Sequence, residues 1–244
     1  MKRLLATHII FIVYLTLSLF ADEVLKKVKL ATVEWPPFTV KNSADQGLST
    51  KIVKEIFKTQ GVEVEVYFMP WSRVMKSVKE GEYDAAYPAY YAEERKKFYD
   101  FSESFYASPV HLTTTVDSNI KSTILEELKN YKIGIVNGYV NSPEFDKADF
   151  LNKKKANSDK KNMVKLFGKR LDMIVIDKNC GEYLLKEESR FKNKKLRYLE
   201  PALDKKDLYL LVSKKISYNQ AILNCFSKGI KALKEKGAFE KLLR

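Results

Sequence analysis

One stretch of the chain, residues 81–109, constrains its fold more than any other part of the sequence. The stretch starts with an apolar segment after Asp84, continues through a polar turn that carries Arg95, and then reaches Asp100-Phe101-Ser102 and a longer extended run. This order predicts a short buried strand, a cation held just past the end of that strand, and a chain that then leaves its domain. Few architectures need these three features in succession.

Around this stretch, segments with the apolar spacing of strands alternate with segments that have the spacing of helices. The pattern predicts strands over residues 28–33, 62–68, 84–88, 131–136, 172–176 and 208–212. It predicts helices over residues 47–60, 71–79, 159–167, 179–188 and 219–234. Strands that alternate with helices form mostly parallel sheets with covered faces. The sequence therefore predicts an α/β fold.

The N-terminus has the pattern of an export signal. Lys2 and Arg3 precede an apolar run over residues 4–20, and charged residues begin at Asp22. A positive start, a short apolar run and a small residue, here Ala21, predict a signal peptide over residues 1–21. The alternative is an uncleaved anchor, since the run is just under the length that spans a bilayer. Because no cysteine lies near the predicted cleavage site, we expect no lipid anchor.

The charge of the chain is strongly basic, with 44 Lys and Arg against 31 Asp and Glu and a formal net charge of +13. Such a balance often indicates a nucleic-acid partner. Here the lysines are spread along the chain, and the clusters at residues 153–155 and 192–195 are short. We interpret them as solvated helix faces and turns, and expect no nucleic-acid partner. The mature length of about 220 residues suits one large domain or two small lobes.

Cysteine and histidine usage excludes several kinds of chemistry. Cys180 and Cys225 are the two cysteines, and export permits a disulfide between them. Their separation in the sequence does not say whether they lie within bridging distance, so two free thiols are equally open. After cleavage of the signal, His111 is the one histidine left. A zinc site with two imidazoles is then excluded, as is a Ser/His/Asp triad without His111. We expect no metal, no cofactor and no catalytic residue.

The stretch 81–109 resembles the periplasmic solute-binding proteins of polar-amino-acid ABC transporters, which are the bacterial extracellular solute-binding proteins of family 3. Their pattern is Gly-x-x-Asp, an apolar strand, Thr-x-Glu-Arg-Lys and then Asp-Phe-Ser. The corresponding residues here are Gly81, Asp84, Glu94-Arg95-Lys96 and Asp100-Phe101-Ser102. Two threonines of the family are replaced by Tyr90 and Ala92, so the chain is similar to a divergent member.

This resemblance implies a two-lobed periplasmic-binding-protein fold of type II. Each lobe would be a mixed, mostly parallel sheet flanked by helices. One lobe would comprise residues 22–108 plus 206–244 and the other residues 109–205, with crossings near residues 105–109 and 205–209. Ligands in such folds bind where the carboxyl ends of the strands face each other across a cleft.

The two tryptophans of the chain both follow predicted strands. Trp35 opens Trp35-Pro36-Pro37-Phe38, which resembles the aromatic-x-Pro-Phe segment that covers one face of the ligand in the family. Trp71 follows the second strand, where relatives have another aromatic residue. The neighbouring prolines restrict the backbone and suit a preformed aromatic wall. The alternative is that both side chains serve packing in the core or between the lobes.

Arg95 occupies the position of the residue that binds the ligand carboxylate in the family. A planar guanidinium offers paired donors that match a carboxylate. The alternative for Arg95 is a surface arginine paired with Glu93 or Glu94. Arg73, which follows Trp71, is a second candidate for the anion-binding residue.

In the second lobe, Asp177 follows a predicted strand and corresponds to the family residue that receives the ligand's ammonium group. A helix N-cap is the alternative role, and the two roles are compatible. Gly138-Tyr139 lies where relatives have a Gly-Thr turn against the ligand carboxylate. Tyr139 and Tyr90 thus replace small hydroxyls by phenols and give the cleft an aromatic lining. Specificity for glutamine or arginine therefore does not follow from the resemblance.

Together these features predict a monomeric, periplasmic binding protein without enzymatic activity. It would capture a small polar solute, an amino acid or related carboxylate, and deliver it to an ABC permease in the inner membrane. One alternative is an enzyme on the same fold, like the periplasmic cyclohexadienyl dehydratases, with Glu34 or Asp177 as its acid or base. Another is a sensory module that presents its ligand to a receptor.

Overall fold

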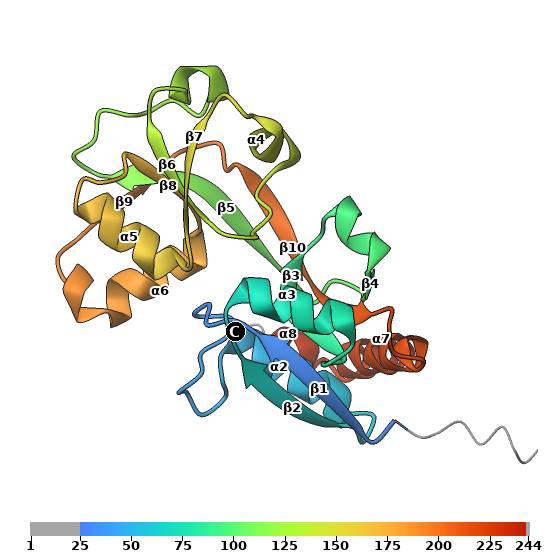
Figure 1. The fold of residues 1–244 in the computed structure, drawn as a ribbon. Helices are drawn as coiled ribbons and strands as arrows, with labels where there is room; N and C mark the ends of the chain where they lie inside the picture. The colour runs from blue at the N-terminus through green and yellow to red at the C-terminus, as the bar shows by residue number, and fades with distance from the viewer. Residues whose placement is uncertain (1–24, 243–244) are drawn as a thin grey trace, which may run out of the picture.

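The computed structural model describes residues 25–242, which form two lobes of mixed sheet and helices (Figure 1). The predicted signal peptide over residues 1–21 lies outside the described residues. Within residues 25–242, no helix combines the length and the apolar character that a membrane span requires.

The first part of the described chain alternates strands and helices as predicted. Its elements are β1 (Lys27–Thr32), α2 (Leu48–Lys58), β2 (Glu63–Phe68), α3 (Trp71–Glu80) and β3 (Ala85–Tyr90). β1 pairs in parallel with β2 on one side and with β3 on the other. A short 3-10 helix, η1 (Glu93–Lys97), and β4 (Tyr99–Phe101) then lead to the long strand β5 (Tyr106–Thr115).

The second part repeats this arrangement around another parallel set of strands. Its elements are η2 (Leu125–Leu128), β6 (Lys132–Val136), α4 (Pro143–Lys147), β7 (Asn152–Ala156), α5 (Asp159–Phe167), β8 (Met173–Asp177), α6 (Lys178–Glu187), η3 (Ser189–Phe191) and β9 (Leu196–Tyr198). β6 pairs in parallel with β7 and β8. The chain then returns through β10 (Asp204–Ser213) and ends in α7 (Asn219–Glu235) and α8 (Phe239–Leu242).

β5 and β10 join the two lobes, and they are antiparallel to each other (Figure 1). The strand order is β2-β1-β3-β10-β5-β8-β6-β7, so these two long strands lie between the parallel sets of both lobes. The residues predicted to cross between the lobes pair with one another, for example Lys205 with Pro109 and Leu208 with Tyr106. The two-lobed fold is thereby confirmed, whereas the exact residue bounds of each lobe stay a prediction.

The lobe that contains both ends of the described chain is held together by close packing of α2 against α7. Ile56 and Phe57 on α2 and Phe226 on α7 are fully buried, and the rings of Phe57 and Phe226 lie 5.5 Å apart. A Cβ atom at Gly229 would stand 2.4 Å from the backbone oxygen of Ile56. Glycine is therefore needed at this position, because a side chain would force the helices apart.

The structure corrects the interpretation of one lysine cluster and decides between the two states of the cysteines. Residues 153–155 are neither a helix face nor a turn but belong to β7, at the edge of the sheet. Lysines on an edge strand keep it soluble and hinder pairing with other chains. Cys180 and Cys225 are both free thiols, and Cys180 is buried.

Candidate functional site

A small cavity lies between the lobes, where β1 and β3 end and where the loop after β6 meets the start of α3. Its walls are Val33, Trp35, Trp71, Pro88, Ala89, Tyr90, Arg95, Tyr139 and Val140. Five of the residues predicted from the sequence are thus brought together at the carboxyl ends of strands, as the rule for open α/β sheets requires. The free space is about 20 Å³, which is room for about one water molecule. Aromatic side chains fill most of this region.

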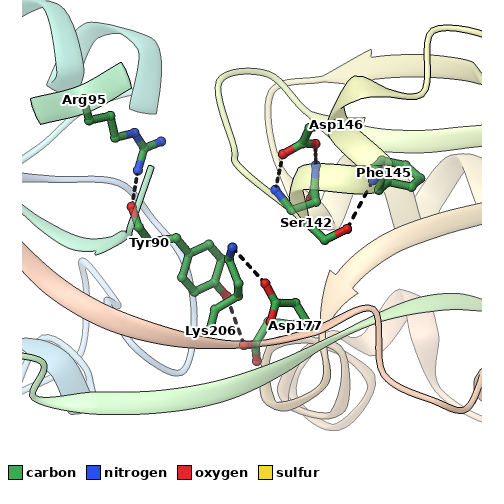
Figure 2. Close-up of polar contacts among 9 residues, drawn as sticks. Tyr90, Arg95, Ser142, Phe145, Asp146, Asp177 and Lys206 are labelled. Atoms are coloured by element: carbon green, nitrogen blue, oxygen red, sulfur yellow. Dashed lines mark hydrogen bonds and ion pairs between the residues drawn. The ribbon is translucent and has the colours of Figure 1, made fainter. Parts of the chain in front are cut away.

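Arg95, on η1, is buried and links the two lobes. Its Nη1 donates a hydrogen bond to the backbone oxygen of Tyr90 at 2.6 Å, and its Nη2 donates one to the oxygen of Gly138 at 3.2 Å (Figure 2). The guanidinium carbon lies 5.7 Å from the ring centre of Trp71. Burial lowers the pKa of Arg95 from its ordinary value.

The alternative of a surface arginine is wrong for Arg95, which is only 8% exposed. Glu93, the acid proposed to pair with it, forms its ion pair with Lys96 at 3.0 Å instead. Among the ion pairs of residues 25–242 there is none that involves Arg95. Its two hydrogen bonds end on carbonyl oxygens, which carry no net charge. The guanidinium is therefore a buried cation that can still accept a carboxylate partner.

Both tryptophans contact Tyr139, whose ring lies between them. The ring centre of Tyr139 is 6.0 Å from that of Trp35 and 6.4 Å from that of Trp71, with edge-to-face geometry in both pairs. Trp35 also meets Tyr90 edge to face at 5.4 Å. Such aromatic pairs are favourable beyond the area that they bury. The two phenols that distinguish this chain from its relatives therefore complete one aromatic wall.

The loop that carries Tyr139 is fixed by local hydrogen bonds. The backbone and side-chain nitrogens of Asn141 both donate to the carboxylate of Asp146 at 2.8 Å, and Ser142 caps α4 through the amide of Phe145 (Figure 2). Gly138 has a positive φ of 78°, which favours glycine. Its oxygen accepts hydrogen bonds from Trp71 and Arg95, so the turn is tied to the opposite lobe.

Asp177 ends β8 and is also the N-cap of α6. Its Oδ1 accepts the amides of Asn179 at 2.9 Å and Cys180 at 3.2 Å, and its Oδ2 accepts the hydroxyl of Tyr90 at 3.2 Å (Figure 2). The N-cap role proposed for this residue is therefore confirmed. Burial raises the pKa of Asp177 to about 6, although its hydrogen bonds oppose this effect.

A second buried acid, Asp159, lies beside Asp177 and was missed by the sequence reasoning. It is the first residue of α5, directly after the N-cap Ser158, and is 5% exposed. Burial, and then the charge of Asp177, raise the pKa of Asp159 to about 7, while a hydrogen bond with the Cys180 thiol lowers it. The signal that could have found Asp159 is its place after the end of a strand. That strand is β7, whose lysines concealed it.

Near these acids, one polar atom has no hydrogen-bond partner. The buried Nε1 of Trp35 faces the sulfur of Cys180 without a hydrogen bond of normal geometry. The nearby ammonium of Lys206 lies 5.7 Å from the ring centre of Tyr90 but forms its ion pair with Asp204 at 3.1 Å. The site thus holds a free indole donor, a buried cation and two buried carboxyls.

Two predicted residues lie elsewhere. Arg73 is exposed and lines a separate surface hollow beside Tyr67 and Lys76. Glu34 is exposed too, and its Oε2 accepts the backbone amide of Lys41 at 2.9 Å. Neither side chain is among those that line the cavity. Residues 25–242 contain no group of three His, Cys, Asp or Glu side chains placed to hold a metal ion.

The two lobes, their two connecting strands and the interlobe cavity define the class of two-lobed solute-binding proteins. A family model described as Bacterial extracellular solute-binding proteins, family 3, matches residues 28–244, and the chain belongs to this family.

Solved structures of similar fold agree with this assignment. The substrate-binding protein of an amino acid ABC transporter has a TM-score of 0.75 and 24% identity, with 89% of this chain and 97% of that chain covered. An ancestral arginine-binding protein bound to arginine has a TM-score of 0.76 and 22% identity, with 90% and 97% covered. An ancestral amino acid-binding protein, described as a precursor of cyclohexadienyl dehydratase, has a TM-score of 0.71 and 20% identity, with 88% and 92% covered.

Proposed function

We propose that this protein captures a small amino acid or related carboxylate between its lobes and delivers it to an ABC permease in the inner membrane. The observation that carries the proposal is the placement of a buried cation, Arg95, and a buried carboxyl, Asp177, around one interlobe site. They are linked through Tyr90, whose backbone oxygen bonds to Arg95 and whose hydroxyl bonds to Asp177. A ligand with both a carboxylate and an ammonium group offers a partner to each.

Closure of the lobes would follow from the same contacts. Arg95 and Tyr90 belong to the segment before β5, and Asp177 and Tyr139 to the segment between β5 and β10. We propose the lobe bounds predicted above, residues 22–108 plus 206–244 and residues 109–205. A ligand that touches both sets stabilises the closed arrangement only because it binds that arrangement better than the open one.

The identity of the ligand is the most direct test of this proposal. The protein is purified under native conditions, denatured, and the released small molecules are identified by mass spectrometry. We expect an amino acid or a related small carboxylate. Release of a nucleotide, a sugar or a lipid in stoichiometric amount would contradict the proposal.

Binding should change the tryptophan fluorescence. Trp35 and Trp71 are the two tryptophans of the chain, and both line the cavity. Because a ligand displaces the surroundings of both indoles, we expect a saturable change in emission on titration with the identified ligand. Trp35→Phe and Trp71→Phe, measured separately, assign the change to each residue. Unchanged emission at saturation would show that the ligand binds away from this cavity.

The export prediction has its own test. We expect a periplasmic mature protein that begins near Asp22, because residues 1–21 have the pattern of a signal peptide. Cell fractionation and N-terminal sequencing measure both points. A protein retained in the membrane with residues 1–21 intact would support the anchor instead.

An enzyme is the second candidate, and one observation favours it. Asp159 and Asp177 are neighbouring buried acids with raised pKa values, an arrangement that can hold one carboxyl protonated and the other ionised, as acid–base catalysis requires. The similarity to a dehydratase precursor makes cyclohexadienyl acids the substrates to try. We expect no turnover by the purified protein. Turnover that Asp177→Ala abolishes would replace the binding-protein proposal.

A further inference from the structure

Two carboxyl groups lie next to each other on the far side of the aromatic wall. Asp159 comes from the start of α5 and Asp177 from the end of β8, and they are 5% and 4% exposed. Tyr90 and Tyr139 separate them from the cavity described above, because both phenols extend toward the carboxyls. The unpartnered Nε1 of Trp35 lies at the same place, beside Cys180.

No basic group of the described chain neutralises these two acids. The titratable groups that face Asp159 or Asp177 are the other acid, the Cys180 thiol and the phenols of Tyr90, Tyr106, Tyr139 and Tyr198. Lys206, close to the ring of Tyr90, is already paired with Asp204. Buried charges in proteins are normally paired, and an unpaired acid tends to stay protonated. The pair therefore has a charge deficit that a bound cation would supply.

The charges of the whole site lead to the class of ligand. Arg95 offers one positive charge for a ligand carboxylate, and the two acids offer up to two negative charges for cationic groups. A neutral amino acid matches Arg95 and one acid only. A ligand with net positive charge matches all three groups.

We propose that Asp159 and Asp177 together bind the cationic part of a small ligand that carries net positive charge, and that Asp159 is the residue that sets this preference. The inference rests on the proposed binding function and names its ligand class. Tyr139 must turn aside to admit the cation, since its ring now fills the space between the two tryptophans. Its ring and that of Trp35 then provide aromatic faces, which attract cations.

Proton release should accompany this binding. Burial and the neighbouring acid hold the pKa of Asp159 at about 7 in the unliganded protein. A bound cation favours the ionised carboxylate and so lowers that pKa. Below pH 7 the ligand must displace a proton, and affinity for it therefore rises with pH and levels off above the unliganded pKa.

The experiment is isothermal titration calorimetry with five probes at pH 5 and pH 8. L-ornithine and L-arginine carry net positive charge, L-serine and L-glutamine are neutral, and putrescine is a cation without a carboxylate. The proteins are wild type, Asp159→Asn and the control Asp149→Asn, an exposed acid in the same part of the chain. A melting curve of each variant shows that it is folded.

For wild type we expect the cationic amino acids to bind more tightly than the neutral ones. Their affinity should rise about 100-fold from pH 5 to pH 8, since each pH unit below a pKa of about 7 costs a factor of ten. At pH 8, Asp159→Asn should weaken the cationic probes by about 30-fold or more and the neutral ones little. Asp149→Asn should behave as wild type.

The outcomes separate this inference from the proposed function. If the neutral amino acids bind at least as tightly as the cationic ones and Asp159→Asn changes nothing, the inference is overturned while the binding function stands. If putrescine binds and no amino acid does, the cation site stands and the amino acid function falls. If none of the five probes binds wild type, both are overturned.

Discussion

Without ligand, the melting temperature of the wild-type protein is expected to fall as the pH rises from 5 to 8, and Asp159→Asn is expected to remove most of that fall. The cause is the buried carboxyl, whose pKa is about 7 in the folded protein against 3.8 ordinarily. Between these values the folded state binds more protons than the unfolded state, so stability decreases as protons are removed.

The size of the effect follows from the same two pKa values. From pH 5 to pH 8, ionisation of Asp159 should reduce the free energy of unfolding by about 2–3 kcal/mol. For a protein of this length that corresponds to roughly 5–10 °C in melting temperature. Asn keeps the shape of the side chain but cannot ionise, so the variant should melt higher than wild type at pH 8.

Calorimetric or fluorescence melting curves of ligand-free protein measure this difference. Asp149→Asn is the matched control, because it removes an exposed acid and should keep the slope of wild type. An equal slope for wild type and Asp159→Asn would show that the carboxyl is ionised in the folded protein already at pH 5. The buried acid pair would then require a compensating cation within the protein itself.

Arg95→Ala is expected to weaken the binding of a ligand with a carboxylate by about 30-fold to several-thousand-fold. The guanidinium is 8% exposed and is the one arginine that lines the cavity. Loss of one partner from a buried charge pair leaves the other charge without compensation. Isothermal titration calorimetry with the ligand found by mass spectrometry measures the change.

Arg95 also has a structural role, so two comparisons are needed. Its hydrogen bonds to Tyr90 and Gly138 contribute to stability, and their loss should lower it by about 1–3 kcal/mol. The amide of the same ligand, which lacks the carboxylate, should lose far less affinity than the ligand itself. Arg73→Ala should bind as wild type, since Arg73 is exposed on another face. Full binding by Arg95→Ala together with loss in Arg73→Ala would move the anion site to Arg73.

Much of the fold could be predicted from the sequence because its main elements carry local signals. The apolar spacing of residues 159–167 and 219–234 is that of a helix with one buried face, and the structure has α5 and α7 there. The glycine at position 81 ends α3 in the left-handed conformation, with φ 81°. β7 was missed because its three lysines hide the alternation of a strand at the sheet edge.

The candidate site divides in the same way. The sequence by itself determined that Trp35, Trp71, Arg95 and Asp177 follow strand ends, and strand ends of a parallel sheet share one edge. Only the tertiary structure decided that Arg73 and Glu34 lie on the surface, since either could face inward from its element. It also decided that Asp159 meets Asp177, which is 18 residues further along the chain. Charge, pKa and ligand preference depend on such neighbours, and neighbours are set by packing between distant segments rather than by local pattern.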